Sequence, residues 1–264
     1  MPIMSTETEY IRIEDGVLEI TLSTAARGTS LDFAGVAAGT AALAAAGKDV
    51  GAVLLTGSGP NFCAGGDVRG FAAADDRSAH LYELADTLHV FVRALDAAPV
   101  PVVAAVHGWA AGAGMSLVCA ADIAVGGPGT RLRPAYPGVG LSPDGGMSWT
   151  LPRLVGFAKA RDIMLTDTVL DAAEAHRLGI LARLADSDDA VQDAARELAR
   201  TLARGPRASY TSIRTLLSSS ATATLSEQLD AERDAMGKAA GSPTGREGVD
   251  AFLAKRAPDY SGLS

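Results

Sequence analysis

The chain has 264 residues, 48% of them hydrophobic and 20% charged, a composition that excludes a disordered chain and can supply a sizeable core. The formal net charge is −8, whereas nucleic-acid-binding proteins usually carry an excess of basic residues, so we expect no nucleic-acid partner. A phosphorylated small ligand would need only a local basic cluster. The chain has two cysteines, Cys63 and Cys119, which are far apart in the sequence and imply no disulfide framework. This fits a reducing, cytoplasmic location.

The first part of the chain predicts strands and helices in alternation. Apolar and polar residues alternate at 10–13 and 17–22 around an Asp-Gly pair, which predicts a β-hairpin. The Ala-rich segment 31–46 predicts a helix, and the apolar run 51–56 predicts a buried strand followed by a glycine-rich loop at 57–70. The chain starts with acidic residues and no apolar run, so we expect no signal peptide.

An amphipathic helix is predicted after that loop, because leucine and phenylalanine recur there at the spacing of one helical face. The recurring positions are Leu81, Leu84, Leu88, Phe91 and Leu95. A second buried strand at 102–106, a helix at 112–121 and a short strand at 122–125 follow. Strands that alternate with helices in this way indicate an α/β core.

The sequence turns mainly helical after Pro152. One predicted helix carries an apolar stripe at Val191, Ala195, Leu198 and Leu202, and further helices are expected from about Arg207, Ser226 and Pro243. We therefore predict an α/β core at residues 1–204 and a helical appendage at residues 205–264.

One uncharged stretch needs a separate interpretation. Residues 97–121 contain no Asp, Glu, Lys or Arg and are long enough to suggest a membrane span. Prolines and glycines interrupt the stretch, Asp96 and Asp122 flank it, and interfacial basic and aromatic anchors are missing. A buried strand, a turn and a buried helix are the favoured interpretation, so we expect no membrane partner.

Two glycine-rich turns, at 61–68 and 108–115, each follow a predicted buried strand. Small residues let a ligand approach the backbone closely, and a helix that begins at Gly112 leaves free N–H groups at its start. Together these turns could aim N–H donors at one developing oxyanion, although each alone could be an ordinary tight turn.

Other motifs give weaker or negative indications. A dinucleotide site is disfavoured because Leu117 replaces the third glycine of its fingerprint, and no phosphate-binding loop, nucleophile elbow or metal-ligand spacing occurs. In the Gly/Pro loop 140–146, Asp144 could be a general base or simply a turn or cap residue. His89 lies beside an apolar helix face, where a histidine with a structural partner is the more common case.

Taken together, these segments resemble the crotonase (enoyl-CoA hydratase/isomerase) superfamily. The resemblance is carried by FCAGGD (62–67), PVVAAVHGWAAGAG (101–114), AAD (120–122), GLSPDGG (140–146), LPRLVG (151–156) and REGVDAFLAKRAP (246–258). Within the superfamily, the last two segments look most like ring-1,2-epoxyphenylacetyl-CoA isomerases and Δ3,Δ2-enoyl-CoA isomerases.

The resemblance implies a spiral of ββα units whose C-terminal helices form a homotrimer or a dimer of trimers. It also implies an acyl-CoA substrate, with coenzyme A as part of that substrate and no separate cofactor or metal. The site residues that it implies are Gly66 and Ala113 as backbone N–H donors of an oxyanion hole, and Ala64, Asp67, Phe252 and Lys255 as coenzyme A contacts. Tyr136 and Trp149 are candidate pocket walls, although plain packing is the more common role of such residues.

Departures from the family pattern decide between reactions. Ser116 and Tyr136 occupy the positions of the glutamates of family hydratases, whereas Asp144 matches the carboxylate position of the isomerases. Hydration needs an acid and a base around one water, but one carboxylate suffices to move a proton between carbons. We therefore expect double-bond isomerisation through an enolate. The alternatives are a non-catalytic acyl-CoA-binding protein, an enoyl-CoA hydratase, or an aryl-CoA dehalogenase-like enzyme with Asp144 as nucleophile and His89 as base.

Overall fold

The computed structural model describes residues 9–263, so nearly all of the segment in which we expect no signal peptide lies outside it. Its central sheet has six strands in the order β1-β2-β3-β4-β6-β9. Their bounds are β1 Ile11–Glu14, β2 Val17–Ser23, β3 Ala52–Gly57, β4 Val102–Val106, β6 Ile123–Gly126 and β9 Arg183–Leu184. The predicted hairpin is the antiparallel pair β1–β2, and the strands from β2 to β9 pair in parallel.

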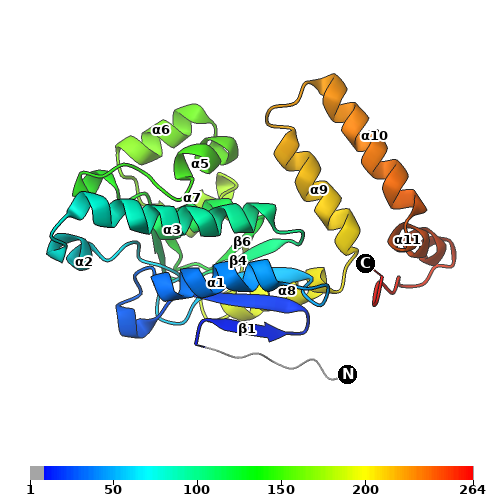
Figure 1. Ribbon diagram of the computed structural model, residues 1–264, viewed down its shortest axis with the longest axis horizontal. Coiled ribbons are helices and arrows are strands. Elements are labelled where there is room, and N and C mark those ends of the chain that lie inside the picture. Colours follow the sequence, from blue (N-terminus) through cyan, green and yellow to red (C-terminus); the bar gives the residue numbers. More distant parts are fainter. Residues whose placement is uncertain (1–8, 264) are drawn as a thin grey trace.

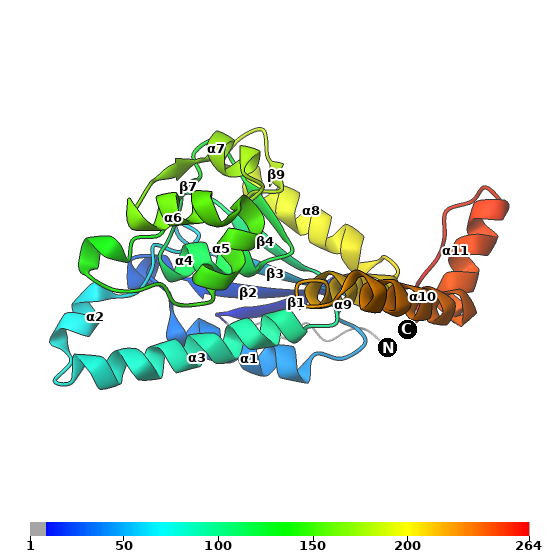
Figure 2. The ribbon, with the colours of Figure 1, turned by 90° about the horizontal axis from the view of Figure 1, so that it is seen from above.

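Helices cover both faces of this sheet (Figures 1 and 2). On one face lie α1 (Phe33–Ala45) and the amphipathic α3 (Arg77–Ala97), and on the other lies α8 (Val191–Ala203). Alternate residues of β3 face the two layers: Val53 and Leu55 join the larger apolar core, while Leu54 joins the core beneath α8. Burial on both faces explains why these strands appear in the sequence as continuous apolar runs.

A second, smaller sheet was not predicted. It has the order β5-β7-β8, with β5 at Trp109–Ala111, β7 at Arg131–Arg133 and β8 at Leu170–Asp171. The remaining helical elements are the 3-10 turns Ala25–Arg27 and Pro137–Val139, α2 Val68–Ala73, α4 Ala113–Ala120, α5 Met147–Val155, α6 Phe157–Leu165 and α7 Ala172–Arg177. The chain thus has the α/β architecture that the sequence predicted, with a second, three-stranded sheet in addition to the six-stranded one.

The uncharged stretch 97–121 contains the expected buried strand and buried helix, but a second short strand occupies part of the expected turn. The stretch forms β4, β5 and α4, and β4 is fully buried. Of the helices in the described part of the chain, none has the length and apolar character that crossing a bilayer requires.

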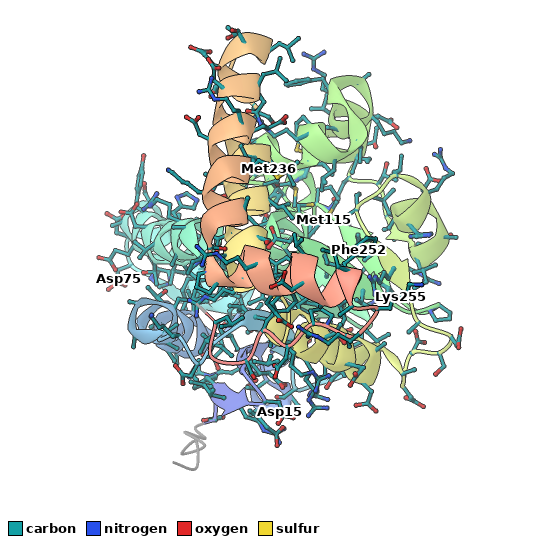
Figure 3. All side chains as sticks on the ribbon, turned by 90° about the vertical axis from the view of Figure 1, so that its right-hand side faces the viewer. Asp15, Asp75, Met115, Met236, Phe252 and Lys255 are labelled. Carbon is teal, nitrogen blue, oxygen red and sulfur yellow. The ribbon has the colours of Figure 1, made fainter. Side chains whose placement is uncertain are left out.

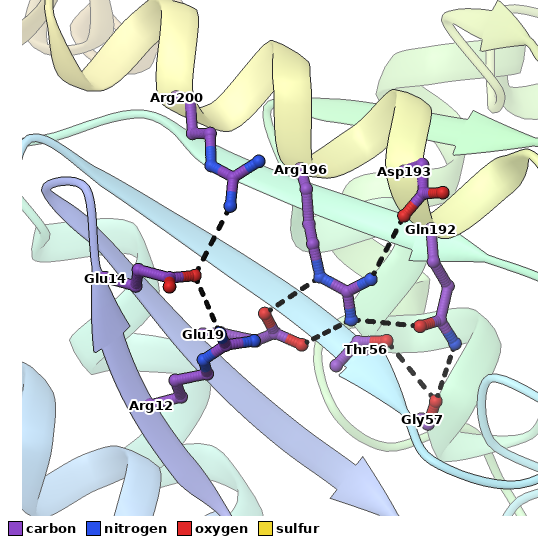
Figure 4. A network of polar contacts seen from close by, with 9 residues as sticks. All are labelled: Arg12, Glu14, Glu19, Thr56, Gly57, Gln192, Asp193, Arg196 and Arg200. Carbon is purple, nitrogen blue, oxygen red and sulfur yellow. Dashed lines mark hydrogen bonds and ion pairs between the residues drawn. The ribbon is translucent and has the colours of Figure 1, made fainter. Parts of the chain in front are cut away.

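Ion pairs fasten the N-terminal hairpin to α8 (Figure 4). Arg196 donates from Nε and Nη2 to the two carboxylate oxygens of Glu19, at 3.1 and 2.9 Å. One turn further along α8, Arg200 lies 3.3 Å from the Glu14 carboxylate. Gln192 donates to the carbonyl of Gly57 at 3.1 Å. Because the ion pair between Arg196 and Glu19 is bidentate and largely buried, it fixes the orientation of α8 on the sheet as well as its position.

The C-terminal helices extend away from the sheet (Figures 1 and 2). They are α9 (Arg207–Ser219), α10 (Leu225–Gly241) and α11 (Pro243–Leu253), which confirms the predicted starts to within one residue. Arg214 of α9 binds the core: it pairs with Asp122 at 2.8 Å and donates to the carbonyls of Leu95, at 3.0 Å, and Ala98. The division into a core and an appendage remains a prediction.

Candidate active site

A cavity of about 790 Å³ opens beside α3. It lies between one side of α3, the loop that precedes α2, the start of α4 and the segment from β7 to α5. Its walls are mainly apolar and include Leu31, Phe33, Val68, Phe71, Leu81, Leu84, Leu88, Val139 and Leu141. Among the predicted site residues, Ala64, Gly66, Ala113, Tyr136 and Asp144 line it. A largely apolar cavity with a few convergent polar groups is typical of a small-molecule site.

Backbone pairing brings the predicted glycine-rich turns together at this cavity. The N–H of Cys63 donates to the carbonyl of Trp109 at 3.0 Å, and the N–H of Ala111 donates to the carbonyl of Cys63 at 2.9 Å. Gly114 allows this approach, because a Cβ there would lie 2.3 Å from the Cys63 carbonyl oxygen. The start of α4 therefore packs directly against the first turn.

The N–H groups of Gly66 and Ala113 are candidate oxyanion donors. Gly66 follows Gly65, whose φ is +100°, and its N–H has no acceptor among the described residues. Ala113 is the first residue of α4, so its N–H precedes the hydrogen-bond ladder of the helix. The positive end of the helix dipole adds to the attraction for negative charge at this point.

A chain of hydroxyl groups leads to the carboxylate of Asp144. Tyr136 donates from its hydroxyl to Oδ1 of Asp144 at 2.6 Å, and Ser116 Oγ lies 3.0 Å from the same tyrosine hydroxyl. Ser116 Oγ also lies 2.9 Å from the backbone carbonyl of Asp144. Within the described range, Asp144 is the one carboxylate that lines the cavity. The positions where the family resemblance expects hydratase glutamates thus hold neutral hydroxyl groups around a single acid.

The tyrosine is held in its protonated form. Burial raises the pKa of Tyr136 far above its ordinary value, and the negative charge of Asp144 and the hydrogen bond to it add to that increase. The side chain is 8% exposed. At neutral pH, Tyr136 therefore has a proton to donate to Asp144.

Asp167 fixes the backbone that carries Tyr136. Its Oδ1 accepts the N–H of Ala135 at 2.7 Å, and its Oδ2 accepts from Nε and Nη2 of Arg133 at 3.0 and 2.5 Å. Ala135 has a φ of +63°, a left-handed conformation that is uncommon without glycine. The Arg133 guanidinium lowers the pKa of Asp167, so this carboxylate remains ionised at neutral pH.

His89, to which sequence analysis gave no firm role, lines the cavity. Its Nε2 accepts the N–H of Gly145 at 3.2 Å, so we infer a neutral ring that carries its proton on Nδ1. With the Nε2 lone pair engaged, this nitrogen is not free to accept a proton from a ligand. Across residues 9–263, no cluster of three or more His, Cys, Asp or Glu side chains could hold a metal ion.

The remaining predicted site residues do not line the cavity of this chain. Asp67 caps α2, where its Oδ1 accepts the N–H groups of Arg69 and Gly70 at 3.1 Å. Trp149 does not line the cavity: α5 turns its ring outward, 50% exposed, with the Arg153 guanidinium 3.7 Å from the ring centroid.

Phe252 and Lys255 lie at the end of α11, among the helices that extend from the core (Figure 3). The cavity lies at the opposite end of the molecule, beside α2 and the first turns of α3 (Figures 1 and 2). A single chain therefore does not bring these residues to its own cavity.

Known proteins resemble this chain in both sequence and fold. A family model described as enoyl-CoA hydratase/isomerase matches residues 12–263. A 1,2-epoxyphenylacetyl-CoA isomerase of Escherichia coli K12 is 37% identical over 214 residues, which are 80% of this chain and 80% of that protein. A Rhodobacter capsulatus protein named probable enoyl-CoA hydratase is 36% identical over 259 residues, 98% of this chain and 100% of the relative. The crystal structure of an enoyl-CoA hydratase from Polaromonas gives a TM-score of 0.89 at 34% identity, covering 94% of this chain and 98% of that one.

Proposed function

Because the chain belongs to the enoyl-CoA hydratase/isomerase family, we propose that it isomerises the double bond of an acyl-CoA thioester, with Asp144 as its single base. The observation that carries this proposal is the polar content of the cavity. Asp144 is its one carboxylate among the described residues, and the neutral hydroxyls of Ser116 and Tyr136 surround it. This arrangement supplies one proton acceptor instead of the acid and base that adding water would use.

The first step forms an enolate. The thioester oxygen lies between the N–H groups of Gly66 and Ala113, while Asp144 takes a proton from the carbon next to the carbonyl. Negative charge then moves onto the thioester oxygen, where the fixed N–H dipoles stabilise it without having to reorient. The backbone hydrogen bonds of Cys63 join the two glycine-rich turns and so fix the positions of these two donors relative to each other.

The second step returns the proton. Asp144, now protonated, delivers it to C4 of the acyl chain, or to the equivalent carbon of a ring, and the double bond moves between C3–C4 and C2–C3. Atoms balance, because the carbon skeleton loses and gains one proton and the carboxylate is regenerated. No water enters the product.

The walls favour an apolar acyl group. Leu81, Leu84 and Leu88 present one face of α3 to the cavity, and Phe71 closes it from α2. This surface fits an alkenyl chain or a ring, and the E. coli relative is named for a ring substrate. We propose a substrate of one of these classes, carried as a coenzyme A thioester.

The proposal is tested by adding the protein to a 3-enoyl-CoA and following the ultraviolet absorbance of the conjugated 2-enoyl thioester. A steady rise that scales with protein concentration is expected. Product identity, read by mass spectrometry, distinguishes the other candidates. A gain of one water from 2-enoyl-CoA would identify a hydratase, halide release from a haloaryl-CoA a dehalogenase, and binding without turnover a non-catalytic protein.

We propose that the C-terminal helices assemble the chain into a trimer or a dimer of trimers. Leu225, Leu229 and Met236 of α10 are 76%, 55% and 72% exposed, and Phe252 at the end of α11 is 82% exposed. Several solvent-exposed apolar side chains on helices that extend from the core are typical of an interface between subunits. Sedimentation at micromolar concentration is expected to give three or six copies, and a monomer would contradict the proposal.

Lys255 is proposed to contact the coenzyme A bound by a neighbouring subunit. Replacing it in Lys255→Glu reverses the charge near a phosphate, so the dissociation constant of acyl-CoA is expected to rise by about tenfold and to depend less on salt. Titration calorimetry at low and high salt measures both quantities. Lys238→Glu, an equal charge change on α10, is the control. Equal effects of the variants, or none for Lys255→Glu, would refute the assignment.

A further inference from the structure

The carboxylate of Asp144 has unequal oxygens. Oδ1 accepts the Tyr136 hydroxyl at 2.6 Å, whereas Oδ2 has no hydrogen-bond donor among residues 9–263. A distance of 2.6 Å lies within the range of hydrogen bonds between a hydroxyl and an ionised carboxylate. The tyrosine therefore holds one oxygen and leaves the other for a ligand in the cavity.

The proton count fixes the direction of this bond. Tyr136 has one hydroxyl proton, and the carboxylate is the strongest acceptor within its reach. Ser116 is fully buried, and its single proton can go to the carbonyl of Asp144 at 2.9 Å, the hydroxyl of Tyr136 at 3.0 Å or the carbonyl of Gly112 at 3.3 Å. With each of these choices, the Tyr136 hydroxyl still donates its hydrogen bond to Asp144. The hydroxyl cluster thus has one consistent arrangement around an ionised Asp144.

The backbone at Tyr136 is fixed by contacts that do not involve the Asp144 carboxylate. Asp167 binds the N–H of Ala135 and the guanidinium of Arg133, and so holds the left-handed turn that directs Tyr136 toward Asp144. On the other side, the N–H of Gly145 is bound by His89 Nε2. Both partners of the Tyr136–Asp144 bond are therefore held by further hydrogen bonds.

We propose that Tyr136 is a positioning residue, which orients Asp144 by binding Oδ1 and so presents Oδ2 to the carbon that loses and regains the proton. The inference rests on the proposed function, because it takes Asp144 as the base. Tyr136 does not itself move a proton in this scheme. Its role is to stabilise the ionised carboxylate and to fix the direction of its free oxygen.

Tyr136→Phe tests this role, because it keeps the ring and removes the hydroxyl. We expect kcat for 3-enoyl-CoA to fall about 10- to 100-fold, in line with the loss of a hydrogen bond to a charged group, while KM stays within about twofold. The split between kcat and KM is the deciding readout, because the variant keeps the cavity walls and loses only the group that orients Asp144. A purely structural role would raise KM as well.

Tyr10→Phe is the matched control. It also removes a tyrosine–aspartate hydrogen bond, from Tyr10 to Asp32 at 2.9 Å, but outside the cavity, so kcat and KM should not change. If Tyr136→Phe keeps the kcat of the unaltered protein, or raises KM as much as it lowers kcat, while Asp144→Asn is inactive, the positioning role is wrong and the proposed function stands. If Asp144→Asn remains fully active, both are wrong. Loss of fold in Tyr136→Phe, seen by circular dichroism, would also overturn the inference, because it assigns the hydroxyl to orientation and not to stability.

Discussion

Asp144→Asn is expected to lower the rate of 3-enoyl-CoA isomerisation by about 10³-fold or more, at the upper part of the range for loss of a general base. The replacing amide has the shape of the carboxylate, and its oxygen can still accept the Tyr136 hydroxyl. It cannot take up a proton at neutral pH. Acyl-CoA binding should stay within a few-fold, since the Gly66 and Ala113 donors and the apolar walls are untouched.

Asp76→Asn provides the control for this change. Asp76 caps α3, which lines the cavity, and its Oδ1 accepts the N–H of Ala79 at 3.0 Å. Asparagine caps helices about as well as aspartate, so the fold and the rate should be preserved. Stopped assays with a product standard measure both variants. Isomerisation at the unaltered rate in Asp144→Asn would show that the base lies elsewhere.

Ala113→Pro is expected to reduce kcat by about 10²- to 10³-fold, the usual effect of removing one oxyanion donor. Ala113 is the first residue of α4, a position at which proline is tolerated because its N–H has no role in the helix. The change therefore deletes the proposed donor while α4 keeps its hydrogen bonds. The proline ring also crowds the site, so KM is expected to rise.

A matched control distinguishes damage to the helix from the loss of the N–H donor. Phe157 is the first residue of α6, follows a glycine with positive φ as Ala113 does, and lies outside the cavity. Phe157→Pro should therefore keep the full rate. An ester in place of the amide at Ala113, introduced by backbone substitution, removes the N–H without the ring and should lower kcat alone. Full activity of that ester would exclude Ala113 as a donor.

Sequence analysis predicted the elements with long, regular patterns. The helices α3 and α8 were found because apolar residues recur in them at helical spacing, the hairpin because apolar and polar residues alternate in it, and the buried strands because they are continuous apolar runs. The C-terminal helices begin within one residue of the expected positions. The buried strand and helix within 97–121 were correctly separated from a membrane span. The glycine-rich turns were recognised as one possible site, and the structure brings Gly66 and Ala113 to one cavity.

Features that depend on distant contacts could not be predicted. The strands β7 and β8 span three and two residues, too few for any periodicity, so the second sheet was missed. The bond between Tyr136 and Asp144 requires a turn whose conformation is imposed by Asp167, far along the chain. His89 lies beside an apolar stripe in the sequence, and only the path of the loop after β7 brings Gly145 to it.

The central claim is that a single carboxylate moves a proton and that no water is added. The most direct measurement is the ratio of kcat/KM for isomerisation of a 3-enoyl-CoA to kcat/KM for hydration of the 2-enoyl-CoA with the same chain, in one preparation of the unaltered protein. With Ser116 and Tyr136 in place of an acid–base pair, we expect isomerisation to be faster by about 10²-fold or more, the effect of a missing general acid or base on hydration. Hydration at an equal or greater rate would contradict the account.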